Sequence, residues 1–433
     1  MEKFFKLKEQ GSDVQTEITA GITTFLATMY IIVVNPGIIS TTGMPFSGVL
    51  TATVLVSAFS SIMMGLYAKN PIVLAPGMGI NAFFTYSVVI GMKIPWEVAL
   101  GAVFWSGIIF LLLSTFNIRT HIVKAIPRQI RYGVAGGIGL FITFIGLKNA
   151  GFIVSNKATL VGMGILDAFT VTFVAGMIIT AIMVVKKVRG ALVIGVVVTT
   201  LLAVPIGRWW GGNSVAVAWK GFFAAPDFSL LFRLDFLGSL RYALWPVIFA
   251  FLFTDMFDSL STFIGVAEAG NLKDDRGEPR NMKQSLIVDA VATTISGLFG
   301  TSSGTSYIES ATGIEQGGRT GLTAVVAGVL FLPFMFFSPL LSIVPPIATA
   351  PVLVLVGVFM MKPVMQIRWD QFDDAIPSFL AMILIPLTFN ITKGIIWGFL
   401  TWTIIKLVIG KKVEVSITLL IIDVLAILSL IYY

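Results

Sequence analysis

The sequence has no cysteine and one histidine, His121, among its 433 residues. The lack of cysteine excludes disulfides, thiol nucleophiles and thiolate-bound metals. The histidine lies in a basic loop, so we expect no histidine-based metal site and no cofactor. Charged residues are also scarce, at 12% of the chain, whereas soluble domains average roughly 25%.

Hydrophobic residues make up 56% of the chain, more than one soluble core can bury. The sequence therefore predicts an all-α polytopic membrane protein with about 14 spans. Residues 1–16 are polar and basic, which indicates a tail rather than a cleaved signal peptide. The predicted spans are 17–40, 47–68, 72–91, 96–116, 130–147, 164–185, 190–207, 240–265, 283–300, 303–318, 321–340, 345–361, 375–389 and 391–409, followed by an apolar stretch at 415–433.

Most of the 29 Lys and Arg residues fall in loops on one side of this predicted topology. The positive-inside rule places that side, and the N-terminus, in the cytoplasm. We expect a multi-pass protein of the plasma (inner) membrane. The net charge of +7 is thus an orientation signal, and we expect the lipid bilayer, not nucleic acid, as its partner.

The predicted spans repeat with an offset of about 225 residues, which indicates two halves of seven spans each. An odd number of spans per half gives the halves opposite orientations, as in many transporters. Chance spacing of similar apolar blocks is the alternative.

Spans three and ten both begin with sequence that suits a helix poorly. Residues 70–84 read "NPIVLAPGMGINAFF", and residues 300–313 read "GTSSGTSYIESATG". Proline removes a backbone donor and glycine weakens a helix. We therefore expect an extended stretch before a half-helix in each span. Such backbone must line a protein interior or a wet cavity.

Four acids, Asp255, Asp258, Asp289 and Glu309, fall inside predicted spans. Each costs roughly 2.5–3.5 kcal/mol to insert at a helix centre. Asp255 and Asp258 are three residues apart and share a helix face. Acids that bind and release protons suit proton coupling, for which Glu309, Asp258 and Asp255 are the candidates. A structural role is the alternative, and for Asp289 it is at least equally favoured.

Other candidate substrate contacts lie near the same breaks. Asn81 follows the break in span three, and an amide inside a span needs partners. Thr262 lies four residues from Asp258, on the same helix face. Phe25 and Phe83 offer flat stacking surfaces, although a core or lipid-facing position is the commoner one for any phenylalanine.

Five motifs in order make the chain resemble the AzgA-like purine permeases, the adenine, guanine and hypoxanthine branch of the nucleobase–ascorbate transporter superfamily. The motifs are "TEITAGITTFLATMYIIVVNP", "APGMGINAFF", "TDMFDSLST", "TSYIESATG" and "GGRTGLTAVV". The resemblance implies a seven-plus-seven inverted repeat in which short antiparallel strands break spans three and ten. It also implies a core domain at 17–116 and 240–340 and a gate domain at 128–207 and 345–433.

The resemblance further implies proton-coupled import of purine bases such as hypoxanthine, guanine or adenine. Asp258 and Glu309 match the acidic substrate ligands of the superfamily, while Asp255 and Asn81 match substrate positions of the purine branch. Ser306, beside Glu309, is a further candidate contact and departs from the uracil and xanthine pattern.

Several alternatives stay open at this point. They are an anion carrier of the sulfate or bicarbonate type, a uracil or xanthine permease, a channel, and sodium rather than proton coupling. An aspartyl protease is disfavoured, because both acids lie on one helix, so we expect no enzyme. A homodimer is one alternative for the oligomeric state.

Overall fold

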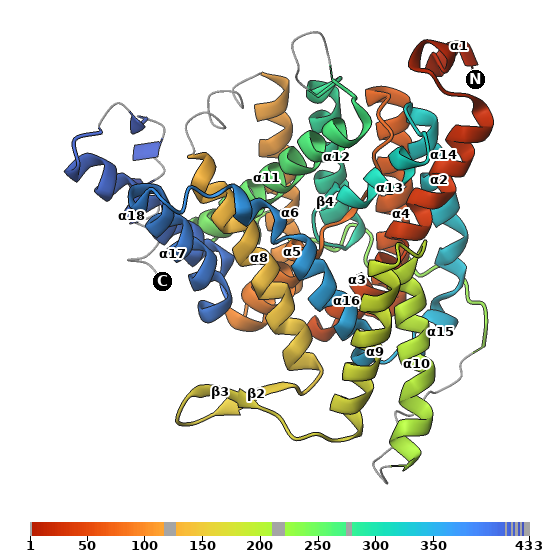
Figure 1. Cartoon of the computed structure of the whole chain (residues 1–433), viewed down its shortest axis with the longest axis horizontal. Coiled ribbons are helices and arrows are strands. Elements are labelled where there is room, and N and C mark those ends of the chain that lie inside the picture. The colour runs from red at the N-terminus through yellow and green to blue at the C-terminus, as the bar shows by residue number, and fades with distance from the viewer. Residues whose placement is uncertain are drawn as a thin grey trace.

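The computed structural model is a mostly helical molecule (Figure 1). It describes residues 2–116, 127–209, 221–273, 279–411, 414–416, 419, 420, 423, 424 and 427. Eight helices in these residues are long and apolar enough to cross a membrane, and three shorter apolar helices accompany them. The prediction of a polytopic helical membrane protein is confirmed.

The described part of the first half contains three strands among its helices, of which β2 and β3 pair with each other. Its elements are α1 (Glu2–Phe5), η1 (Lys8–Gln10), α2 (Val14–Thr28), α3 (Ile31–Ile39), η2 (Ser40–Thr42), α4 (Phe46–Met63), η3 (Met64–Ala68), β1 (Leu74–Pro76), α5 (Met78–Ala82), η4 (Phe83–Gly91), α6 (Trp96–Thr115), α8 (Arg128–Asn149), β2 (Ile153–Asn156), β3 (Leu160–Met163), α9 (Ala168–Val185) and α10 (Ala191–Trp209).

The second half holds the fourth strand. Its elements are η5 (Gly238–Leu240), η6 (Tyr242–Leu244), α11 (Trp245–Gly270), α12 (Met282–Phe299), β4 (Gly304–Ser306), η7 (Ile308–Ser310), α13 (Ala311–Glu315), α14 (Gly321–Phe331), η8 (Leu332–Phe336), α15 (Ser338–Leu341), α16 (Pro346–Phe359), η9 (Lys362–Gln366), α17 (Phe372–Thr388) and α18 (Ile391–Val408).

Most predicted spans match these helices, with three differences. The first span is not one α-helix, because α2 ends at Thr28 and α3 begins at Ile31 and contains Pro36. A β2–β3 hairpin follows α8, where no strand was predicted. The stretch at 415–433 lies largely outside the described residues.

The helices pack as two bundles. The strand-containing bundle comprises α2–α6 and α11–α14 with β1 and β4; in it α12 packs on α6, and α14 packs on α2 and α4. The second bundle comprises α8–α10 and α16–α18, where α8 contacts both α16 and α17. The bundles meet where α5 lies against α8, α11 against α18, and α16 against α3.

One contact between the halves requires glycine on both sides. A Cβ on Gly65 would lie 2.2 Å from the carbonyl oxygen of Gly321, and a Cβ on Gly321 would lie 2.0 Å from that of Gly65. The two backbones therefore approach too closely for any side chain. This contact joins the end of span two to the start of α14.

The start of α14 is also capped by an acid from α2. Glu17 has no exposed surface, and its carboxylate accepts hydrogen bonds from the N–H groups of Arg319 (2.8 Å), Thr320 (3.1 Å) and Thr323 (3.2 Å). The Thr323 hydroxyl donates a fourth, at 2.6 Å. These are N–H groups that a helix start leaves without partners, so Glu17 has a structural role.

Candidate functional site

The two broken spans meet at a short sheet in the interior. Strand β1 pairs with β4 in antiparallel register, with Leu74 opposite Ser306 and Pro76 opposite Gly304. The Gly77 N–H extends the ladder by donating to the Ser303 carbonyl at 2.9 Å. All six strand residues are buried. The predicted strands in spans three and ten are thus confirmed, and they satisfy backbone groups that lipid could not.

Each strand leads into a short helical element, as the sequence predicted. In span three β1 is followed by α5, which continues as the π-helix η4. In span ten β4 is followed by the 3-10 turn η7 and the five-residue α13. Glu309 lies within η7, directly after the strand crossing.

Glu309 and Asp258 are the two site acids that keep some exposed surface. Glu309 accepts a hydrogen bond from the Tyr30 hydroxyl, with the two oxygens 2.8 Å apart. Asp258 on α11 accepts from the Thr305 hydroxyl of β4 at 3.4 Å. Two acids from different elements therefore flank the strand crossing, where a small molecule with N–H donors could reach them.

Asp255 and Asp289 have no exposed surface. Asp255 accepts a hydrogen bond from Thr293 of α12, and the same hydroxyl lies 3.0 Å from the Gly304 carbonyl. Asp289, one helical turn before Thr293, accepts from Ser306 at 3.1 Å. The two acids therefore lie behind β4, on its α12 side. Asp255 and Asp258 both approach β4, but only Asp258 is accessible.

Asn81 is fully buried on α5, and its side-chain oxygen accepts a hydrogen bond from Ser302. Its amide nitrogen has no hydrogen-bond partner among the described residues. A buried donor without a partner is costly. The Asn81 amide nitrogen therefore keeps an unused donor, and Ser302 of the other half fixes the orientation of the side chain.

The remaining candidates are spread more widely. Phe83 is fully buried, with its ring 4.9 Å from that of Phe251 on α11. Thr262 is buried one turn beyond Asp258. The Phe25 ring packs edge-to-face on Phe331 at 5.0 Å, so it takes part in packing between α2 and α14.

Sequence reasoning did not single out several residues that bind the candidate side chains. Tyr30 is one aromatic among many in the sequence, and the break between α2 and α3 at which it lies has no local sequence signal. Thr293, Thr305 and Ser302 gave no signal, since hydroxyls are common throughout the chain. Their importance comes from the crossing of β1 and β4.

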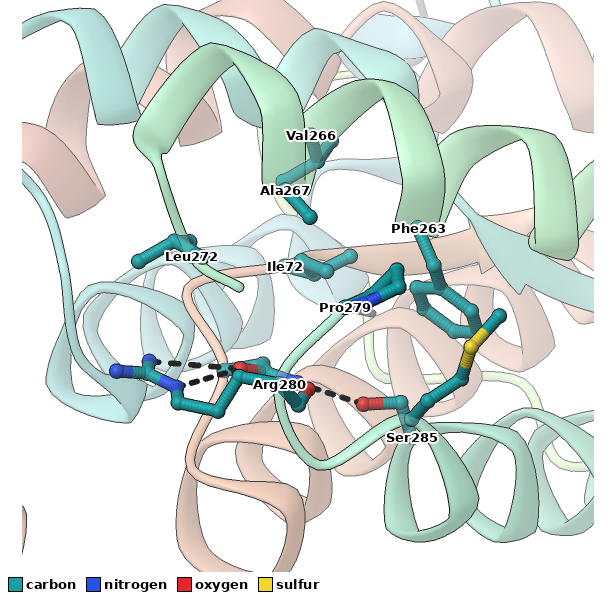
Figure 2. A pocket seen from close by; sticks show the side chains of 10 residues that line it. Ile72, Phe263, Val266, Ala267, Leu272, Pro279, Arg280 and Ser285 are labelled. Atoms are coloured by element: carbon teal, nitrogen blue, oxygen red, sulfur yellow. Dashed lines mark hydrogen bonds between the residues drawn. The ribbon is translucent and has the colours of Figure 1, made fainter. Parts of the chain in front are cut away.

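A small pocket, whose lining includes none of the four acids, lies where α11 ends and α12 begins (Figure 2). Its wall is mostly apolar and includes Ile72 and Phe263. Arg280 and Asn70 bond to each other, and Asn70 also donates to Ser285 at 2.7 Å. Burial lowers the pKa of Arg280. Because its polar groups already have partners, this pocket is not the candidate substrate site.

The fold and the paired broken spans define a polytopic membrane protein, and the permease family matched below makes it a transporter rather than an enzyme. Solved structures share the fold at low sequence identity. The transmembrane domain of the cyanobacterial bicarbonate transporter BicA aligns with a TM-score of 0.68 at 16% identity, covering 89% of this chain and 97% of that one. The structure of SLC26A9 aligns with a TM-score of 0.61 at 12% identity, covering 90% of this chain and 65% of that one.

A family model described as "Permease family" matches residues 15–397, and the chain belongs to this family. It is 42% identical to "Adenine permease AdeP" of Escherichia coli (strain K12) over 100% of this chain and 96% of the relative. It is 40% identical to "Guanine/hypoxanthine permease PbuO" of Bacillus subtilis (strain 168), over 95% of this chain and 96% of the relative. The family expected from the motifs is confirmed.

Proposed function

We propose that this permease imports purine nucleobases together with protons. The observation that carries the proposal is the pair of accessible acids, Asp258 and Glu309, beside the β1–β4 crossing. The relatives named as adenine and guanine/hypoxanthine permeases support the choice of substrate class.

The chemistry of a purine suits these groups. A purine offers N–H donors and ring-nitrogen acceptors around a flat aromatic face. The carboxylates of Glu309 and Asp258 accept from N–H groups, and the Asn81 amide nitrogen donates to a ring nitrogen or carbonyl. A neutral base carries no charge, so its accumulation needs a coupled ion. An acid that alternates between charged and neutral forms can carry a proton.

We assign the strand-containing bundle to the core domain and the second bundle to the gate domain. Contacts within each bundle are more extensive than those between them, which supports movement of one against the other. In this proposal the core carries the base and the proton across the membrane by alternating access. The N-terminus lies in the cytoplasm and the protein in the plasma membrane, as the distribution of Lys and Arg favours.

The test is uptake of labelled hypoxanthine into cells that lack purine transport. Adenine, guanine, xanthine, uracil and sulfate serve as competitors, each with and without a protonophore. Inhibition by adenine or guanine, and loss of accumulation with the protonophore, are expected. Competition by sulfate alone would favour an anion carrier, and competition by uracil or xanthine alone would favour that branch. Uptake that depends on sodium and resists the protonophore would overturn the choice of ion.

A further inference from the structure

Arg131 on α8 lies at the contact between the two bundles. Its guanidinium carbon is 5.3 Å from the centre of the Phe257 ring on α11. Phe257 is 6% exposed and packs on Phe253 at 4.5 Å, which in turn packs on Phe399 of α18 at 5.3 Å. A cation on the face of an aromatic ring is attracted to it, so Phe257 gives Arg131 a defined position.

This position leaves the guanidinium incompletely bonded. Its Nε is buried and has no hydrogen-bond partner among the described residues, and no described carboxylate lies within ion-pair distance of it. A guanidinium fits best against a carboxylate, which it can bind through two parallel hydrogen bonds. The aromatic ring is therefore a weaker partner than a nearby acid would be.

Such an acid is the residue next to the ring. Asp258 follows Phe257 on α11 and is partly exposed, and the exposed residues Ser261 and Ile264 follow it at intervals of about one turn. In the structure the Asp258 carboxylate accepts a hydrogen bond from Thr305 of β4, so α11 must move relative to α8 to bring this carboxylate to the guanidinium in place of the ring. Arg131 belongs to the second bundle, so the exchange of partner accompanies movement between the bundles.

We propose that Arg131 is the counter-ion of Asp258 during return of the empty carrier. This inference rests on the proposed transport function. With the base bound and a proton on Asp258, the acid is neutral and needs no counter-ion, so Arg131 stays on Phe257. After both are released, a bare carboxylate must cross a region of low polarity, and pairing with Arg131 lowers that cost.

Two transport measurements on the same protein test this role of Arg131, because only one of them requires the empty carrier to return. Net uptake into empty vesicles requires the empty carrier to return, whereas exchange with vesicles preloaded with unlabelled hypoxanthine does not. In Arg131→Gln we expect net uptake to fall about tenfold or more, while exchange stays within about threefold of the unsubstituted protein. Arg131→Lys keeps the charge, so it should recover part of the net uptake.

Arg128→Gln is the matched control, because Arg128 is exposed one turn earlier on α8 and should change neither rate. Arg131→Met keeps the long apolar stem and repeats the test if the Gln variant folds poorly. Equal losses of exchange and net uptake in both variants, or undiminished net uptake, would overturn the proposal. Failure of the unsubstituted protein to move hypoxanthine would instead refute the proposed function.

Discussion

Glu17 and Glu309 are two carboxylates in the same bundle with opposite surroundings. Glu17 has no exposed surface and accepts four hydrogen bonds at the start of α14. Glu309 keeps some exposed surface, and the described residues supply one side-chain donor, Tyr30. A buried acid with a full set of donors stabilises the fold. An accessible acid with unused acceptor capacity can bind a ligand or a proton.

The four acids around β4 differ from one another in exposure. Asp255 and Asp289 are fully buried and bond to hydroxyls of α12 and β4, whereas Asp258 and Glu309 are accessible. We therefore expect substitutions of the accessible acids to change transport first, and substitution of the fully bonded Glu17 to change stability first.

The largest effect is expected for Glu309→Gln, which keeps the shape but removes the charge. Concentrative uptake should fall about 100-fold or more, because the lost group both binds the base and takes part in coupling. Radiolabelled uptake measures the loss, and thermal melting checks that the fold is intact. Glu315→Gln, at the exposed last residue of α13, is the control and should transport normally. Full accumulation by Glu309→Gln would remove this acid from the mechanism.

Glu17→Ala should show the reverse pattern. Loss of the carboxylate leaves buried N–H groups without partners, which costs about 2 kcal/mol of folding free energy. We expect a lower melting temperature in detergent but an unchanged dissociation constant for the base. Glu9→Ala, which removes an exposed pair with Lys6, should change stability by less than about 0.5 kcal/mol. A transport defect in Glu17→Ala at full stability would contradict the distinction.

Tyr30→Phe removes only the hydroxyl that donates to Glu309. A hydrogen bond to a charged group contributes roughly 1.5–3 kcal/mol, so we expect at least about a tenfold decrease in the apparent affinity for the base. Competition uptake measures it. Tyr67→Phe, at a half-exposed tyrosine, is the matched control. An unchanged affinity would mean that Tyr30 does not orient Glu309.

Ser302→Ala should have the smallest effect, because it removes a hydrogen bond between neutral groups. The Asn81 amide would lose its fixed orientation, and its contact with the base would weaken by about threefold. The expected readout is a change in the ratio of adenine to guanine inhibition constants. Ser342→Ala, at an exposed serine, should leave this ratio unchanged. Equal ratios in both variants would exclude Asn81 from selectivity.

Composition and the lengths of the apolar runs were enough to predict most of the spans, because a bilayer demands long apolar segments. The breaks in spans three and ten were predictable too, since Pro76, Gly77 and Gly304 stand where a helix should continue. The strand pairing itself depended on the family resemblance. The break after Thr28 has no glycine or proline to announce it, and Phe25 faces α14 because of long-range packing that no local pattern encodes.

The pairing of β1 with β4 has a consequence for biogenesis. Tyr307 donates a hydrogen bond to the Pro76 carbonyl across 231 residues of sequence, and the strand ladder spans a similar separation. At about 5–20 residues per second, a ribosome needs roughly 10–50 s to make that length. Throughout this interval β1 is without its partner inside or beside the bilayer. Span three must therefore wait at an aqueous or protein-lined site, or be shielded by the insertion machinery, until span ten arrives.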